Sequence, residues 1–300
     1  MTSAAPKPPS RSWRRRLLCA VGCLTLAAFA LRLAGGCYSV GPTASKDAIA
    51  LLPRATIESR DGATTLSYLH AGNPADPRII YIHGTPGDAE NWADLLLNPV
   101  AGCESLSIDR PGFGKTQPPD PLTSFEAQAA AIAPLLLERR SIKPILVGHS
   151  LGGPIAARLA ADHPDRVGGL LIVAGSFDPV HEELDWLERC VMSDTMRATL
   201  PRALANSLAE FRDAKRETLL LAEILDRITC PTIVIHGATD GLVPYENVSY
   251  IQRKLINARP LEVTKLPDQG HFIPWQCPDQ IRTAIDRIRA LLSPPATRTP

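Results

Sequence analysis

A serine flanked by glycines is the first candidate for chemistry. Residues 144–153 read PILVGHSLGG, in which Gly148, Ser150 and Gly152 fit the pattern G-x-S-x-G. An apolar run precedes the pattern and helical spacing follows it, so we expect a strand that turns sharply into a helix. Such a turn strains its corner residue and brings backbones close together, which glycines two positions away permit. We predict that Ser150 Oγ projects from the sheet edge at the positive end of a helix. A tight turn with an incidental serine is the alternative.

An activated serine also needs a general base and an acid that orients the base. Of the seven histidines, His271 is the best candidate for the base, because PDQGHFIPW follows the last expected strand in a loop that can bend back toward the serine. Most of the others lie inside the serine motif, in strand-end His-Gly pairs or at a helix end. Asp240, five residues after the strand residue Ile235, is the candidate acid. Asp268 is too close to His271 along the chain and is interpreted as a turn residue.

Alternating strands and helices must position these residues. Short apolar or β-branched runs predict strands over residues 64–72, 78–84, 105–109, 144–150, 169–175, 231–237 and 261–266. Helical spacing predicts helices over residues 124–140, 154–163 and 278–292, the first capped by Ser124. This order predicts an α/β fold with a mostly parallel, doubly wound sheet and helices on both faces.

The segment between the strands that end at 175 and begin at 231 is longer than one crossover helix needs. Its patterns predict helices over 182–190 and 204–228, so we interpret residues 177–228 as a helical lid over the carboxyl ends of the strands. A plain outer helical layer is the alternative. Residues 55–176 and 229–292 then form the core, after a tether over 37–54 and before a loose tail over 293–300.

The first 36 residues have the composition of an export signal. They contain six basic residues and no acidic one, and an apolar run from Leu17 to Leu31 that is short for a membrane span. LAGGC at residues 33–37 resembles a bacterial lipoprotein cleavage box, with Ala34 where such boxes usually have leucine. The arginines directly before Leu17 resemble a twin-arginine signal. We expect an exported, periplasmic or cell-envelope protein, associated with the membrane through this segment or a lipidated Cys37. An uncleaved anchor is the alternative.

Charge and cysteine content limit the partners. The chain has 32 lysines and arginines and 31 acidic residues, so without its first 36 residues it carries about five net negative charges. Nucleic acid is therefore not an expected partner. The folded part contains Cys103, Cys190, Cys230 and Cys277, without metal-ligand spacing. They could form up to two disulfides, but buried free thiols are the preferred interpretation.

Further motifs resemble the α/β-hydrolase family over about residues 55–292. HGTPG at 83–87 resembles the oxyanion loop after the third strand of the family, and DRPGFGKT at 109–116 resembles the turn after its fourth strand. The resemblance implies a triad in the order Ser150, Asp240, His271 and oxyanion donors at the backbone N–H groups of Thr85 and Leu151. It implies no metal and no organic cofactor.

Two assignments stay open beside this resemblance. Some members of the family carry the acid after the sixth strand, where GSFDP places Asp178. We favour Asp240 because GATDGLVP matches the commoner pattern.

Asp109 and Arg110 are interpreted as turn and ion-pair residues. Five aromatic residues could line an apolar acyl pocket or belong to the core, namely Trp92, Phe177, Trp186, Phe272 and Trp275.

The nucleophile separates the reactions that this family performs. The dehalogenases and epoxide hydrolases attack with aspartate, whereas position 150 is serine, which favours acyl transfer. Thr85 and Leu151 differ from the residues usual in prolyl iminopeptidases, so an ester, thioester or lactone is the expected small-molecule substrate. A non-catalytic receptor of the same fold and a cofactor-free perhydrolase or haloperoxidase are the alternatives.

Overall fold

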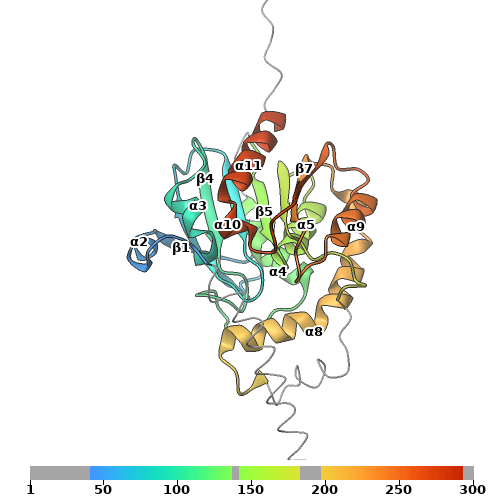
Figure 1. Cartoon of the computed structure of the whole chain (residues 1–300). Coiled ribbons are helices and arrows are strands. Elements are labelled where there is room, and N and C mark those ends of the chain that lie inside the picture. Colours follow the sequence, from blue (N-terminus) through green and yellow to red (C-terminus); the bar gives the residue numbers. More distant parts are fainter. Residues whose placement is uncertain (1–40, 137–141, 183–196, 293–300) are drawn as a thin grey trace, which may run out of the picture.

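A single mixed sheet organises the chain. The computed structural model describes residues 41–136, 142–182 and 197–292, and its eight strands have the order β1-β2-β4-β3-β5-β6-β7-β8 (Figure 1). Pairing is antiparallel between β1 and β2 and between β2 and β4, and parallel elsewhere. The mostly parallel α/β sheet is therefore confirmed. The strands are β1 Arg54–Glu58, β2 Thr65–Ala71, β3 Arg78–Ile82, β4 Glu104–Ile108, β5 Ile145–His149, β6 Gly169–Val173, β7 Thr232–Gly237 and β8 Leu261–Leu266.

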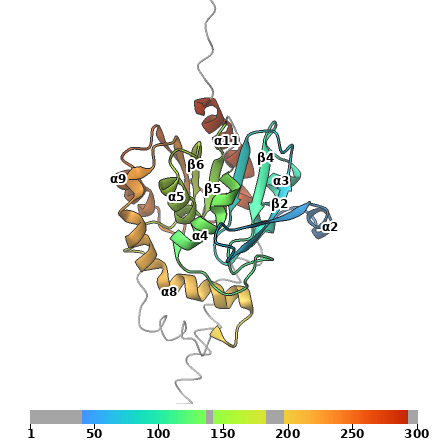
Figure 2. The ribbon, with the colours of Figure 1, turned by 180° about the vertical axis from the view of Figure 1, so that it is seen from behind.

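Strand residues alternate between two cores. Ile80 and Ile82 of β3 pack in the core on one face of the sheet, whereas Ile79 and Tyr81 pack in the core on the other. The first face is covered by α4 (Phe125–Ile132), α5 (Gly152–Asp162) and α9 (Glu246–Lys254), and the second by α3 (Ala93–Leu97), α10 (Ile273–Gln276) and α11 (Pro278–Leu292). Figure 2 shows α4 and α5 in front of the strands, and Figure 1 shows α10 and α11 on the opposite side. Both faces are buried, as parallel strands require.

Most expected elements are present with small shifts in their bounds. Ser124 caps α4 as predicted, accepting a hydrogen bond from Ala127 N at 3.3 Å, and a 3₁₀ turn over Ala133–Leu136 continues this helix. The remaining residues of the predicted helix, 137–140, lie outside the described chain. Helix α5 begins two residues before the predicted start, because the turn at the serine leads directly into it.

The segment predicted as a tether over residues 37–54 has defined secondary structure in its described part, residues 41–54. This part contains a short helix, α2 (Lys46–Ala50), capped by Ser45, and the first residue of β1. The carboxylate of Asp94 also accepts hydrogen bonds from Thr43 N and Ala44 N, at 2.8 and 2.9 Å. The sequence patterns do not predict strand β1, because it is a half-exposed edge strand without a strong apolar alternation.

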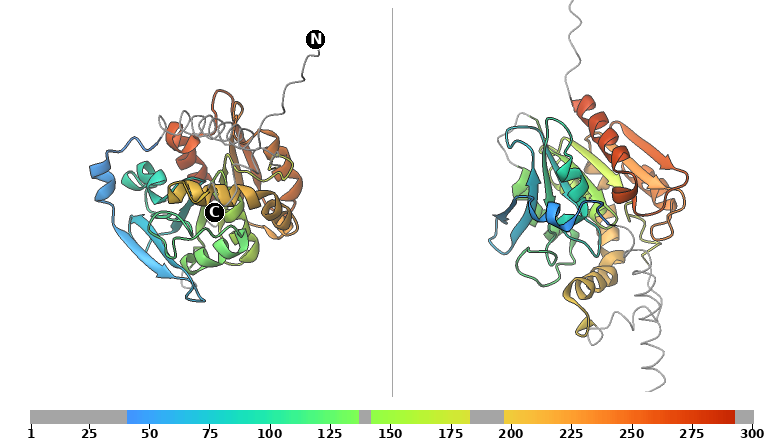
Figure 3. Two further views of the ribbon diagram at one scale, coloured as in Figure 1. Left: turned by 90° about the horizontal axis from the view of Figure 1, so that it is seen from below. Right: turned by 60° about the vertical axis from the view of Figure 1, so that its left-hand side comes forward.

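The insertion between β6 and β7 contributes one long helix in its described part. Helix α8 (Arg202–Ala222) runs along the lower edge of the molecule in Figure 1 and crosses the face seen from below in Figure 3. It binds the loops that follow β3 and β4: Thr85 Oγ1 donates to Ser207 Oγ at 2.9 Å, and Asn206 Nδ2 donates to Gly112 O at 2.7 Å. The helix therefore lies at the carboxyl ends of the strands.

Several expectations fall on residues outside the described ranges. These are the export signal with Cys37, nearly all of the predicted helix 182–190 with Trp186 and Cys190, and the tail over 293–300. Among the described residues, Cys103, Cys230 and Cys277 are free thiols. None of the helices there has the length and apolar character needed to cross a membrane.

Candidate active site

The glycine-flanked serine occupies the sharp turn between β5 and α5. Ser150 has a positive φ of 53°, a conformation that is rare for residues with a side chain. A Cβ on Gly148 would lie 2.3 Å from Gly152 O, and a Cβ on Gly152 would lie 2.3 Å from Ile82 O. The glycines are therefore required because three backbone segments meet around the serine.

Adding one methyl group at this crossing is expected to destabilise the protein. Gly152→Ala forces a Cβ against the backbone oxygen of Ile82, which cannot move without disturbing β3, so we expect the free energy of unfolding to fall by about 3 kcal/mol. Gly241→Ala is the matched control, because no atom lies within 4 Å of its added Cβ. Denaturant unfolding of both variants tests this expectation, and equal losses would contradict it.

The proposed acid and base are in direct contact. His271 Nδ1 donates to Asp240 Oδ2 at 2.8 Å, and both residues are buried. Asp240 Oδ1 accepts hydrogen bonds from Leu242 N at 2.9 Å and Val243 N at 2.8 Å, which fix the carboxylate. Burial raises the pKa of Asp240, but the bonds from His271 and the two amides outweigh it and lower this pKa below its usual range. Asp240 is therefore a carboxylate that orients the His271 ring.

His149 connects this pair to the turn that carries Ser150. His149 Nε2 donates to the backbone oxygen of His271 at 3.0 Å, and the two imidazole rings are 4.8 Å apart. Because His149 precedes Ser150 directly, this bond brings the His271 loop against the serine. Burial lowers the pKa of His149 to about 3, so its ring is neutral at neutral pH.

Ser150 Oγ itself forms no hydrogen bond with any residue in the described ranges. The residue as a whole is half-buried. The alternative acid, Asp178, makes a different contact: its Oδ1 accepts from Val180 N at 3.0 Å. Asn247 Oδ1 also holds the Asp178 amide at 2.8 Å. The structure thus brings Asp240, and not Asp178, to His271.

The two proposed oxyanion amides both flank the serine. A Cβ on Gly84 would lie 2.8 Å from Ser150 Cβ, so the loop after β3 passes directly beside the serine. Thr85 follows Gly84, and Leu151 follows Ser150 at the start of α5. In the part of the chain that the structure describes, neither Thr85 N–H nor Leu151 N–H has a hydrogen-bond acceptor. Both amides are therefore available to a ligand at the serine.

Four of the five aromatic residues named from the sequence lie in the described chain. Trp92 and Phe177 are buried at 2% and 1% exposure, so they belong to the core. Phe272 and Trp275 are half-buried, stack on each other and contact the rings of His271 and His149, respectively. Phe272 therefore lies beside the proposed base, and Trp275 lies beside Phe272 and His149.

Asp109 and Arg110 form buried ion pairs, in agreement with their interpretation from the sequence. Asp109 pairs with Arg54 of β1, and Arg110 pairs with Glu210 of α8. Asp109 also accepts hydrogen bonds from Ala89 N at 2.8 Å and Lys115 N at 3.0 Å, so it holds together the loops after β3 and β4. Sequence reasoning did not identify Glu210, Asn247 or the contact of His149 with His271, since each depends on a partner far away in the chain.

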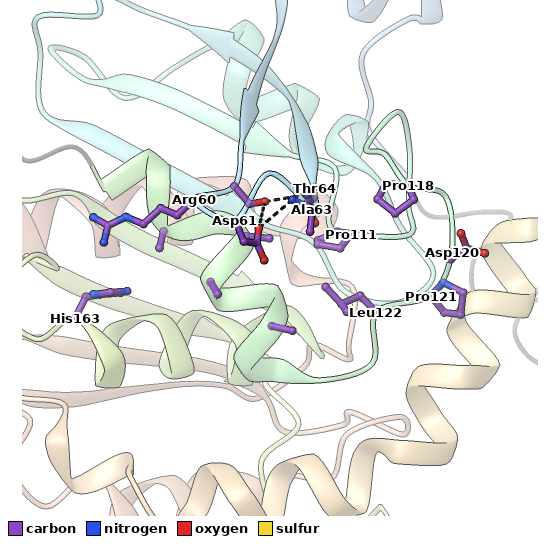
Figure 4. A pocket seen from close by; sticks show the side chains of 15 residues that line it. Arg60, Asp61, Ala63, Thr64, Pro111, Pro118, Asp120, Pro121, Leu122 and His163 are labelled. Carbon is purple, nitrogen blue, oxygen red and sulfur yellow. Dashed lines mark hydrogen bonds between the residues drawn. The ribbon is translucent and has the colours of Figure 1, made fainter.

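A separate cavity of about 480 Å³ lies on the α4 side of the sheet (Figure 4). Pro111, Pro118, Leu122 and Ala131 contribute to its apolar lining, and His163 lies at its edge. It includes none of the residues proposed for the triad or the oxyanion site. No group of three or more potential metal ligands is found among residues 41–136, 142–182 and 197–292.

Three buried neutral histidines make stability depend on pH. Burial is the main cause that lowers the pKa values of His83, His149 and His236 in the folded protein. The unfolded chain binds protons at these residues near pH 6.5, whereas the folded chain does not, so unfolding becomes more favourable as the pH falls below about 6.5. For His149 the effect continues down to about pH 3, because its folded pKa is about 3.

His149→Gln is expected to reduce this dependence on pH. The glutamine amide can still donate to His271 O but does not titrate, so the slope of the unfolding free energy against pH decreases by up to about 1.4 kcal/mol per pH unit between pH 6 and 4. Urea unfolding of the wild type and the variant at several pH values measures both slopes. An unchanged slope would show that His149 is protonated in the folded protein.

Comparison with known proteins agrees with this fold. A family model for the alpha/beta hydrolase fold matches residues 77–212. The chain is 26% identical to the esterase Rv0045c of Mycobacterium tuberculosis, over 77% of this chain and 87% of the esterase. It is 25% identical to a putative non-heme chloroperoxidase of Synechocystis sp., over 77% of this chain and 97% of that protein. A crystal structure of a bacterial membrane phospholipase A superposes with a TM-score of 0.62 at 22% identity, covering 93% of this chain and 99% of the other. The match over residues 77–212 and the sheet topology together show that the chain has the α/β-hydrolase fold.

Proposed function

We propose that the protein is a serine hydrolase that cleaves a carboxylic ester, thioester or lactone through an acyl-enzyme. The observation that carries the proposal is the Asp240–His271 hydrogen bond, held by His149 against the strained turn that presents Ser150. Similarity to an esterase supports the reaction class, and the serine at position 150 supports a covalent acyl intermediate.

Each group has a defined role in the proposed cycle. His271 removes the proton of Ser150 Oγ as the oxygen attacks the carbonyl carbon, and the N–H groups of Thr85 and Leu151 stabilise the resulting oxyanion. His271 then protonates the leaving alcohol or thiol as the carbon–oxygen or carbon–sulfur bond breaks. Water, deprotonated by His271, cleaves the acyl-enzyme by the same steps. Asp240 keeps Nδ1 of His271 protonated, so that Nε2 accepts the serine proton.

A second reaction deserves a direct test because of one comparison. The similarity to a putative non-heme chloroperoxidase favours perhydrolysis, in which hydrogen peroxide replaces water in the attack on the acyl-enzyme. This reaction would use the same serine, histidine and aspartate and needs no metal or organic cofactor. A non-catalytic receptor of the same fold would use none of them.

Labelling with a fluorophosphonate tests the proposal without knowledge of the natural substrate. The reagent reacts only with an activated serine, so we expect stoichiometric labelling of the wild type at Ser150, mapped by mass spectrometry. p-Nitrophenyl esters of graded acyl length then measure hydrolysis, and added hydrogen peroxide measures perhydrolysis through peracid formation. A folded protein that takes no label and cleaves none of the esters would favour the receptor.

We further propose that the protein is exported and associated with the membrane through residues 1–36 or a lipidated Cys37. The basic and apolar composition of this segment supports export, and LAGGC supports lipidation. A shift in gel mobility that globomycin and Cys37→Ala both abolish is the expected result. Unchanged mobility in both cases would leave an uncleaved anchor as the better explanation.

A further inference from the structure

We propose that Arg110 is a positioning residue that orients the Thr85 amide, and that Glu210 of α8 holds Arg110 in place. The inference rests on the proposed function, in which this amide stabilises the oxyanion. Arg110 Nη2 donates to Gly84 O at 2.9 Å and to Glu210 Oε2 at 3.0 Å. Arg110 Nη1 donates to Glu210 Oε1 at 2.5 Å and to Gln128 Oε1 at 2.8 Å. The guanidinium and the carboxylate are both excluded from solvent.

The contact at Gly84 O controls the direction of the neighbouring N–H. Gly84 C=O and Thr85 N–H belong to one planar trans peptide and therefore point in opposite directions. The oxygen accepts from Arg110 Nη2 and from His83 Nδ1, the latter at 2.6 Å, so two donors determine how this peptide is turned. Because a hydrogen bond to an oxyanion weakens steeply when its donor is misaligned, Arg110 acts on the reaction without touching the substrate.

Two residues of helix α8 act on the segment that contains Gly84 and Thr85. Ser207 and Glu210 lie three residues apart, on the same face of the helix. Ser207 Oγ accepts from Thr85 Oγ1, while Glu210 acts on Gly84 O through Arg110. Helix α8 thereby becomes part of the support for the oxyanion site, beyond covering the ends of the strands.

Stability alone is a weak explanation for this ion pair. Burying a guanidinium and a carboxylate removes both from water, and apolar residues of similar size are often equally stable in such positions. The pair Arg78–Glu104 provides a comparison within the same chain. It is also buried, and Arg78 Nη1 donates to a backbone oxygen, Leu135 O, at 2.7 Å. Arg78 begins β3, at the end of the strand opposite to Gly84, so this second pair has no route to the oxyanion site.

The matched double variants Arg110→Met/Glu210→Met and Arg78→Met/Glu104→Met separate positioning from stability. Each removes both members of a buried ion pair and one donor to a backbone oxygen. For the first variant we expect kcat and the rate of fluorophosphonate inactivation to fall by about 10- to 100-fold, with KM within about twofold of the wild type. For the second variant we expect both rates to stay within about twofold.

Equal rates in the two double variants would overturn the inference while leaving the proposed function intact. A wild type that neither takes the label nor cleaves esters would overturn the proposed function, and the inference with it. If the first double variant does not fold, kcat and KM of the single variant Arg110→Lys test the positioning role instead. Lysine keeps the charge opposite Glu210 but has one nitrogen in place of the two terminal nitrogens Nη1 and Nη2, so kcat falls by about fivefold or more at unchanged KM. Wild-type kcat in folded Arg110→Lys would contradict the proposed role.

Discussion

Replacing Ser150 by alanine is expected to lower kcat for ester hydrolysis by about 10⁴-fold or more and to abolish fluorophosphonate labelling. The variant retains the turn, because alanine differs from serine only by the hydroxyl oxygen. Ser150 Oγ forms no hydrogen bond within the described chain, so the free energy of unfolding should change by less than about 0.5 kcal/mol. Loss of activity without loss of stability would separate a nucleophile from a structural serine.

Ser176→Ala is the control for this experiment. Ser176 lies beside the same turn, since its N–H donates to Ser150 O at 3.4 Å, and its own hydroxyl donates to the carboxylate of Glu182. We expect this variant to keep its labelling and its kcat within a few fold of the wild type. If Ser150→Ala hydrolyses the ester at the wild-type rate, another group attacks the substrate.

The sequence predicted the central strands because their residues are buried on both faces. Continuous apolar runs such as LLIV in β6 are typical of strands enclosed in a parallel sheet, and all seven expected strands are present. The edge strand β1 was missed for the opposite reason, since its residues are half-exposed and its role as a strand depends on pairing with β2. Local patterns therefore identify the middle of the sheet better than its edge.

The candidate site likewise contains some residues that local sequence patterns identify and others that they do not. Ser150, Asp240 and His271 could be proposed from the sequence because each stands in a short motif whose place after a strand is visible there. Arg110 was expected to form an ion pair, but its partner Glu210 is 100 residues away, and nothing local indicates which face of α8 meets the loop. The contact of His149 with the backbone of His271 likewise requires two loops to be placed in space. Long-range polar partners depend on tertiary packing that periodicity does not describe.

The second large effect is expected at the proposed acid. Asp240→Asn should lower kcat by about 10³- to 10⁴-fold, because it reverses the hydrogen bond to His271. The asparagine oxygen can still accept from Leu242 N and Val243 N, so the side chain keeps its orientation. Its NH₂ group then faces His271 Nδ1 and donates to it, where the carboxylate accepted. The neutral ring must place its proton on Nε2, and Nε2 can no longer accept the proton of Ser150.

Asp178→Asn provides the comparison that decides between the two candidate acids. Its Oδ1 accepts only from Val180 N among the described contacts, and asparagine can keep this bond, so kcat should stay within about threefold of the wild type. Steady-state kinetics on one p-nitrophenyl ester, with urea unfolding to show that both variants are folded, measures the difference. If Asp178→Asn loses more kcat than Asp240→Asn, the acid of the triad follows β6, and His271 must turn away from Asp240 before the reaction begins.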